Sequence, residues 1–145
     1  MPGITNPGEE YFKDGLWGWD GAQWRKLALL FGYTDRYADQ TVNTSAAAGT
    51  NALVLTTVPA GEVWVVFSIA AFDANSATTT ILTGARLGAV EHYLTSKATP
   101  AASELVLWTG QIVLKAGDYL FGVFYGCTLN DDLYLTACGY KMKVT

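Results

Sequence analysis

Three of the five tryptophans lie within eight positions of one another, in the segment GLWGWDGAQWRKL (15–27). Indole rings in such a cluster can stack on sugars, or they can anchor one protein on another by burying a large apolar area. The Asp20-Gly21 pair is a strong hairpin signal, and a loop of residues 20–23 sets Trp19 opposite Trp24, with Trp17 on the face of Trp19. A single hairpin is marginal in water. We therefore expect the tryptophans to be buried against a ligand or another protein surface.

Catalytic chemistry has little basis in this sequence. His92 is the only histidine, and its neighbour Glu91 points to the opposite face of a strand. No nucleophile-elbow, zinc-protease, phosphate-loop or dinucleotide motif is present. Asn130-Asp131-Asp132 offers oxygen ligands of the kind calcium takes, but the same residues are typical of a hairpin turn, which we favour. We expect a protein that is not an enzyme and has no cofactor or metal.

The two cysteines, Cys127 and Cys138, are expected to be free and buried. If their strands form a hairpin turning at residues 129–132, Cys127 lies opposite Tyr134 and Cys138 opposite Val123, which is too far out of register for a disulfide. Two cysteines with one distant histidine also make a poor zinc site.

The composition indicates a surface shared with other subunits. Charged residues make up 15% of the chain, against about 25% in ordinary soluble domains, while hydrophobic residues make up 50%. This balance predicts a homo-oligomer. The net charge of −4, with scattered Lys and Arg, argues against nucleic acid as a partner. No apolar run of membrane-spanning length and no secretory signal is present, so we expect no membrane partner and assembly in a cytoplasm.

The expected elements are β-strands. Short runs rich in β-branched and aromatic residues, punctuated by Gly, Asn and Asp, predict strands near 52–58, 62–72, 78–87, 89–95, 105–114, 118–127 and 132–142. Segment 24–33 is either a helix or an extended, buried segment. Ten of the 22 charged residues lie in 1–40 and only two in 41–85. We therefore predict an all-β fold, a β-sandwich or jelly-roll domain over 41–145, preceded by an N-terminal arm (1–40) that contains a short hairpin.

Two patterns refine this expectation. The segments TTVPAGEVWVVFSI (56–69) and QIVLKAGDYLFGVF (111–124) share an Ala-Gly-acidic turn before a strand, with glycine supplying a positive φ. The strands over 62–72 and 118–127 are apolar on both faces, whereas a free sandwich exposes one polar face. We expect these strands to be covered on both sides, by a neighbouring subunit or by the arm.

The stretch from Leu16 to Leu27, with Phe31-Gly32-Tyr33-Thr34-Asp35-Arg36-Tyr37, resembles the arms of small virion proteins of tailed bacteriophages. In those proteins an aromatic W-D-G-x-x-W-R-K-L stretch precedes a compact β-domain, and VPAGEVWVV is similar to their strand openings. The resemblance spans residues 11–75. It implies a capsid cement or decoration protein on the virion surface, assembled in the host cytoplasm, with a trimer favoured and the major capsid protein, or another virion protein, as the partner.

Two functions therefore compete. In the first, the arm docks on protein through aromatic anchors and rim cations. These are Tyr11, Phe12, Trp17, Trp19, Trp24, Arg25, Phe31, Tyr33, Arg36 and Tyr37. In the second, the same tryptophans are sugar platforms of a carbohydrate- or receptor-binding module in a tail fibre or baseplate. Exposure of the tryptophans in the free protein distinguishes the two, and we favour protein docking.

Overall fold

The computed structural model describes residues 17–19, 24–26 and 33–143, and within them it contains strands and no helix. The all-β prediction is confirmed. The strands are β1 (Trp17–Trp19), β2 (Trp24–Lys26), β3 (Tyr33–Asn43), β4 (Gly49–Val54), β5 (Glu62–Asp73), β6 (Thr80–Leu87), β7 (Val90–Ala98), β8 (Val106–Lys115), β9 (Tyr119–Cys127) and β10 (Leu133–Lys143).

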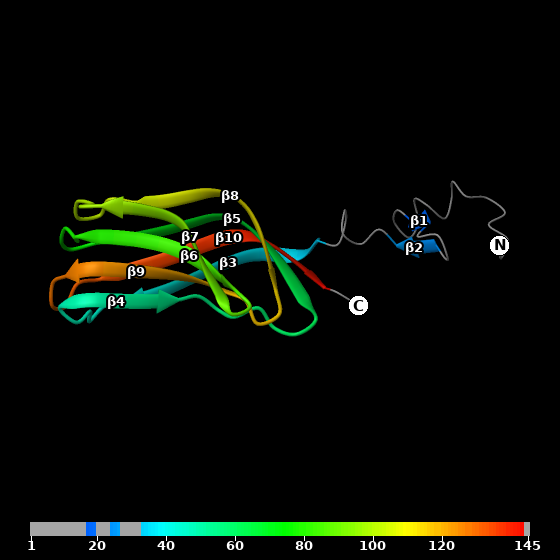
Figure 1. Ribbon diagram of the computed structural model, residues 1–145, viewed down its shortest axis with the longest axis horizontal. Helices are drawn as coiled ribbons and strands as arrows, with labels where there is room; N and C mark the ends of the chain where they lie inside the picture. The colour runs from blue at the N-terminus through cyan, green and yellow to red at the C-terminus, as the bar shows by residue number, and fades with distance from the viewer. Residues whose placement is uncertain (1–16, 20–23, 27–32, 144–145) are drawn as a thin grey trace.

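Strands β3 to β10 form a sandwich of two four-stranded antiparallel sheets. One sheet has the order β3-β10-β5-β8 and the other β4-β9-β6-β7, and the second lies in front in Figure 1. The chain crosses between the sheets at every connection except the hairpin of β6 and β7. Eight strands connected in this way make a jelly roll, one of the two sandwich forms expected from the sequence.

The predicted hairpin near the N-terminus is present as the pair β1 and β2. Its register sets Trp19 opposite Trp24 and Trp17 opposite Lys26, as the Asp20-Gly21 turn signal predicts. The four turn residues themselves lie outside the described residues.

The core is formed where the two sheets face each other. Along β5 the side chains of Trp64, Val66, Ile69 and Ala71 point into the core. The two-residue period of a strand holds on either side of a bulge at Phe67, which separates Val66 from Ile69 by three positions. From the second sheet the main inward residues are Leu53, Ile81, Ala85, Leu120 and Phe124.

The sandwich begins earlier in the chain than expected. Residues 33–40, assigned to the arm from their charge, form most of β3, which pairs with β10 from Tyr33 to Asn43. Tyr37 points into the core, where its ring lies 4.6 Å from that of Trp64. A strand at the edge of a sheet tolerates outward charges such as Arg36, which explains why composition placed the boundary too late.

The expectation that the last two strands form a hairpin is wrong. Strand β9 pairs with β4 and β6, whereas β10 pairs with β3 and β5 in the opposite sheet. The register derived for Cys127 and Cys138 therefore does not exist, although both thiols are free as expected. Cys127 is buried and Cys138 is exposed, so only one of them fits the expected buried thiol.

The two Ala-Gly-acidic turns lie against each other at one end of the sandwich. Gly61 and Gly117 adopt φ values of +80° and +90°, as predicted for these turns. Val58 N–H donates to the Asp118 carbonyl at 2.9 Å, and Gly117 N–H donates to the Val58 carbonyl at 2.9 Å. The repeated sequence therefore builds a paired structural element, which links the connection before β5 to the connection before β9.

Candidate interaction surfaces

The outer face of the β3-β10-β5-β8 sheet is apolar across much of its area, and we call it the apolar sheet face. Four of its aliphatic and aromatic side chains are about half exposed: Val42 (40%), Phe67 (43%), Leu107 (50%) and Val113 (55%). Fully burying one such side chain is worth about 1.5–3 kcal/mol. Each of these four therefore leaves on the order of 1 kcal/mol to be gained if a partner covers it.

A depression with a volume of about 460 Å³ lies across three strands of this face. Its lining includes the small side chains Ala38, Ser68, Thr136 and Cys138 from β3, β5 and β10. Cys138 pairs with Ala38 on one side and with Ser68 on the other, where the thiol sulfur lies 3.0 Å from the Ser68 hydroxyl oxygen. Short side chains on three neighbouring strands thus leave a hollow in the sheet surface.

Aromatic pairs border this depression at both ends. Towards one end of the sheet, Phe72 and Tyr134 stack with ring centroids 4.7 Å apart and an interplanar angle of 3°. Towards the other end, the rings of Phe67 and Tyr140 lie 5.5 Å apart. The β5 bulge between Val66 and Ser68 brings Phe67 onto the surface. A hollow between two aromatic ridges is a shape into which side chains of a partner can fit.

Charge is sparse on the apolar sheet face. By strand alternation its outward charged residues are Arg36 and Lys115, at positions paired with Tyr140 and Val63 respectively. Lys115 lies beyond the Phe67–Tyr140 pair as seen from the depression, whereas Arg36 lies in the row of Tyr140, two residues from Ala38 at the edge of the depression. One carboxylate, that of Asp39, lines the depression, and both of its oxygens already accept hydrogen bonds, from Gln40 N–H and Thr56 N–H. A partner that covers the depression therefore meets few ionised groups, whose removal from water is the costly step in docking polar surfaces.

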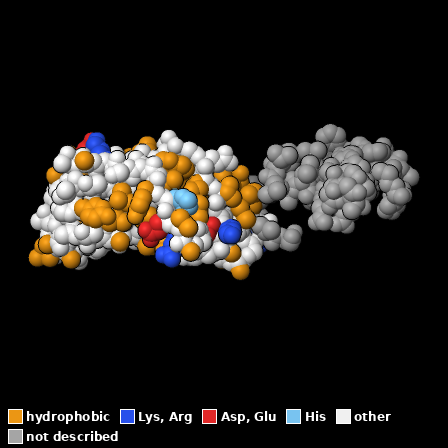
Figure 2. All heavy atoms as spheres, viewed as in Figure 1, with side chains coloured by type: hydrophobic (Ala, Val, Ile, Leu, Met, Phe, Trp, Pro, Cys, Tyr) orange, Lys and Arg blue, Asp and Glu red, His pale blue; other side chains and the backbone are white. Residues whose placement is uncertain are grey.

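The outer face of the β4-β9-β6-β7 sheet has a mixed character. Figure 2 shows hydrophobic side chains gathered over this sheet, with acidic and basic side chains beside them. The most exposed aromatic residue there is Tyr93, with 66% of its surface accessible. The two faces of the sandwich thus offer different chemistry to a partner.

The structure describes seven of the ten sequence-predicted anchors. Trp17, Trp19, Trp24 and Arg25 lie in the β1–β2 hairpin, and Tyr33 begins β3. Tyr11, Phe12 and Phe31 lie outside the described residues. Arg36 is exposed on β3, as a rim cation requires. Tyr37 is 2% exposed and packs on Trp64, so it is part of the sandwich core and no anchor for a partner.

The residues considered for catalysis or metal binding have structural surroundings. His92 is exposed on the edge strand β7. Within the described residues no group of three or more His, Cys, Asp or Glu side chains is placed to hold a metal. Asn130 has a φ of 68° in the turn before β10, and the Asp131 carboxylate accepts hydrogen bonds from Thr128 N–H and the Ser76 hydroxyl, both at 2.6 Å. Residues 130–132 therefore belong to a turn, as expected, but this turn joins strands of opposite sheets and is not the expected hairpin turn.

Asp131 also forms part of a buried carboxyl pair with Asp73. Asp73 Oδ1 accepts hydrogen bonds from the N–H groups of Asn75 and Ser76, whereas Oδ2 is buried with no donor among the described residues. Burial raises the pKa of Asp73, and the neighbouring Asp131 raises it further. Burial acts to raise the pKa of Asp131 as well, but hydrogen bonds from Ser76 and Thr128 and one to Asp73 lower it overall. The raised pKa favours the protonated form of Asp73, in which Oδ2 carries a hydrogen that can be donated to Asp131.

Sequence reasoning did not identify the individual residues of the apolar sheet face, but it did recognise that the strand over 62–72 is apolar on both faces. The expectation that 62–72 is covered on both sides came from its two apolar faces. One face of β5 does pack in the core, and the other carries Phe67 and Phe72. The missing information was which strands lie beside β5, because the β10 and β8 neighbours complete the surface and neither is adjacent to β5 in the chain.

Within the described residues no helix is long and apolar enough to cross a membrane.

No family model matches the chain, and no curated protein matches it. Three solved structures with a similar fold are distant. A chain from infectious bursal disease virus, Gx strain, is 13% identical with a TM-score of 0.36, over 75% of this chain and 32% of that one. A chain from the Gt strain is 8% identical with a TM-score of 0.29, over 86% and 34%. The carbohydrate binding module CBM6cm-2 from Cellvibrio mixtus lichenase 5A, in complex with cellotriose, is 11% identical with a TM-score of 0.31, over 75% and 92%. The chain spans about a third of the length of the two viral chains. These likenesses concern the β-fold alone.

Proposed function

We propose that the chain is a non-enzymatic structural protein of a virion, which attaches to other shell subunits by burying the apolar sheet face. The observation that carries this proposal is the half-exposed set Val42, Phe67, Leu107 and Val113 around a depression whose one charged lining residue, Asp39, already accepts hydrogen bonds from two backbone N–H groups. An apolar, hollowed surface of this kind typically marks a protein–protein contact.

The partner we propose is the major capsid protein, with the chain bound over the shell as a cement or decoration protein. The resemblance of the Trp17–Tyr37 stretch to arms of tailed-bacteriophage virion proteins supports this choice. Homo-oligomerisation, with a trimer favoured, is supported by the low fraction of charged residues, 15% of the chain. The arm then adds a second attachment to the sheet face, and two linked contacts bind more tightly than either alone.

The test is to mix the purified full-length protein with shells assembled from the major capsid protein alone, and to measure co-sedimentation. We expect saturable binding, and electron microscopy of the decorated shells should place added density over the joints between capsid subunits. Absence of binding to shells, together with density at the tail of complete particles, would contradict the cement role and favour a tail fibre or baseplate module.

A further inference from the structure

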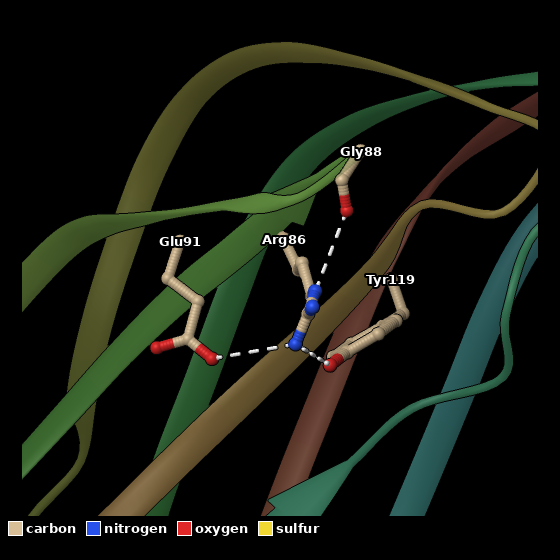
Figure 3. Close-up of polar contacts among 4 residues, drawn as sticks. All are labelled: Arg86, Gly88, Glu91 and Tyr119. Carbon is tan, nitrogen blue, oxygen red and sulfur yellow. Dashed lines mark hydrogen bonds and ion pairs between the residues drawn. The ribbon is translucent and has the colours of Figure 1, made fainter.

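A polar cluster lies on the outer face of the β4-β9-β6-β7 sheet, opposite the apolar sheet face. Arg86 on β6 has Glu91 of β7 and Tyr119 of β9 as its cross-strand partners (Figure 3). Arg86 Nη1 donates to the Tyr119 hydroxyl oxygen at 3.3 Å and lies 3.9 Å from Glu91 Oε1, while Nε donates to the Gly88 carbonyl at 3.4 Å. The guanidinium is thus held from three sides.

The cluster keeps unused hydrogen-bonding capacity although it is held in place. The Arg86 and Glu91 side chains are 40% and 47% exposed. Arg86 Nη2 and Glu91 Oε2 have no hydrogen-bond partner among the described residues. A fixed set of donors beside a free carboxylate oxygen suits a ligand that both donates and accepts, as a pair of neighbouring hydroxyl groups does.

An aromatic platform lies one row further along the same face. Gly84 is paired with Phe121 on β9 and with Tyr93 on β7, two residues from Arg86 along β6. This spacing is about 7 Å along the strand, which is close to the width of one sugar ring. The platform and the polar cluster are therefore near enough to contact one small ligand together.

The exposed Tyr93 ring packs edge-on against a buried ring. Phe121 lies directly over Gly84, where an added Cβ would meet the Phe121 ring at 2.6 Å. The Tyr93 ring meets Phe121 edge-on, with centroids 6.0 Å apart and an interplanar angle of 83°. Phe121 is only 5% exposed, whereas Tyr93 is 66% exposed. The buried ring supports the exposed one, which leaves an aromatic face open to a ligand.

The charges on this site restrict the kind of ligand. A flat apolar protein surface laid over it would take Arg86 and Glu91 out of water without new partners, at a net cost. An anionic ligand would be repelled by Glu91 as it approached Arg86. A neutral ligand with apolar C–H faces and hydroxyl groups at its edge can cover the ring and also satisfy the pair.

We propose that the Tyr93–Arg86–Glu91 surface binds a neutral saccharide, with one pyranose ring stacked on Tyr93 and neighbouring hydroxyls bonded to Arg86 and Glu91. This site lies on the opposite side of the sandwich from the apolar sheet face, so a chain docked through that face still presents it. A single shallow site binds weakly, and several copies on a shell bind a glycan-bearing surface more tightly through multivalency.

The experiment screens labelled full-length protein on an array of neutral and acidic glycans and then titrates the best neutral ligand by calorimetry. We expect Tyr93→Ala to weaken binding by about tenfold, because the stacking surface is lost. Tyr93→Phe should keep most of the affinity, since the ring remains, and Arg86→Gln should weaken it several-fold. Tyr125→Ala is the matched control, because Tyr125 is a 39% exposed tyrosine further along the same face, paired with Thr80, and should not change binding.

Four results would overturn the proposal, and three of them concern glycan binding. The first is that the protein binds no neutral glycan on the array, and the second is that it prefers acidic glycans. The third is that Tyr93→Ala and Tyr125→Ala lose the same amount of affinity. A fourth is protection of Tyr93 from solvent when the protein binds capsid shells, which would make this face a protein contact. Failure here leaves the proposed shell attachment standing, because shell binding is measured separately and depends on the opposite face.

Discussion

Replacing Leu107 with glutamate tests whether the apolar sheet face docks on protein. Leu107 is 50% exposed on the edge strand β8, so the side chain contributes to the surface more than to the core. Surface substitutions of this kind usually change folding stability by no more than about 0.5 kcal/mol. The Leu107→Glu protein should therefore fold with nearly the wild-type melting temperature.

The effect on attachment should be much larger. Docking would bury the remaining half of Leu107, which is worth roughly 1 kcal/mol of apolar transfer. The glutamate forfeits this and also places an unpaired carboxylate in a desolvated contact, at a further cost of about 2–4 kcal/mol. The sum is on the order of 3–5 kcal/mol, which corresponds to a loss of affinity of at least about a hundredfold.

The assay is co-sedimentation with capsid shells over a range of protein concentrations. Val54→Glu is the matched control, because Val54 is a 47% exposed aliphatic residue on an edge strand of the opposite sheet. We expect Val54→Glu to bind as the wild type does. If Leu107→Glu binds shells as tightly as Val54→Glu, the apolar sheet face is not the docking surface and this part of the account is wrong.

Three further predictions concern the fold. Deleting residues 1–32 should leave the sandwich folded and reduce attachment. Deleting residues 1–40 removes eight of the eleven residues of β3 and should lower the melting temperature steeply. Equal melting temperatures for the two truncated proteins would contradict the assignment of β3 to the sandwich. Gly139→Ala should destabilise the protein by several kcal/mol, because the added Cβ would lie 1.9 Å from a carbonyl oxygen of β5, and wild-type behaviour in urea unfolding would refute that contact. The pKa of Asp73 is raised in the folded state, so the protonated carboxyl stabilises the fold at low pH, and this stabilisation is lost as the pH rises through the pKa of the folded state. The Asp73→Asn protein should therefore lose less stability than the wild type between pH 4 and 8. Urea titrations across this range measure the difference, and a difference that is independent of pH would argue against a shared proton with Asp131.

Most of the strands were predictable because their residues carry the signal locally. The seven strands expected after residue 50 all occur, and the turns at Gly61 and Gly117 have the positive φ that their sequences demand. The hairpin register of Trp19 and Trp24 follows from Asp20-Gly21 alone. These features depend on residues within a few positions of one another, so no knowledge of the tertiary fold is needed.

The features that sequence reasoning missed depend on distant partners. Strand β3 is rich in charge, and only its pairing with β10, about a hundred residues later, reveals it as part of the sandwich. The connection from β9 to β10 has the residues of a tight hairpin, yet it crosses between the sheets. Similarly, nothing near Arg86 in the chain indicates that Tyr119 lies beside it. The proposed contact surfaces are assembled across strands, and local sequence patterns do not record that assembly.

Cys138 provides the most direct test of the central claim, because it lies in the depression of the apolar sheet face and is exposed. Cys127 is an internal control, since burial raises the pKa of that thiol and it lies in the core. The measurement is the rate at which a thiol reagent modifies each cysteine in the free protein and in the protein bound to capsid shells, followed by mass spectrometry. The account predicts that Cys138 reacts quickly in the free protein and at least tenfold more slowly on the shell, while Cys127 reacts slowly in both states. An unchanged rate at Cys138 in the bound protein would contradict the claim that this face is the docking surface.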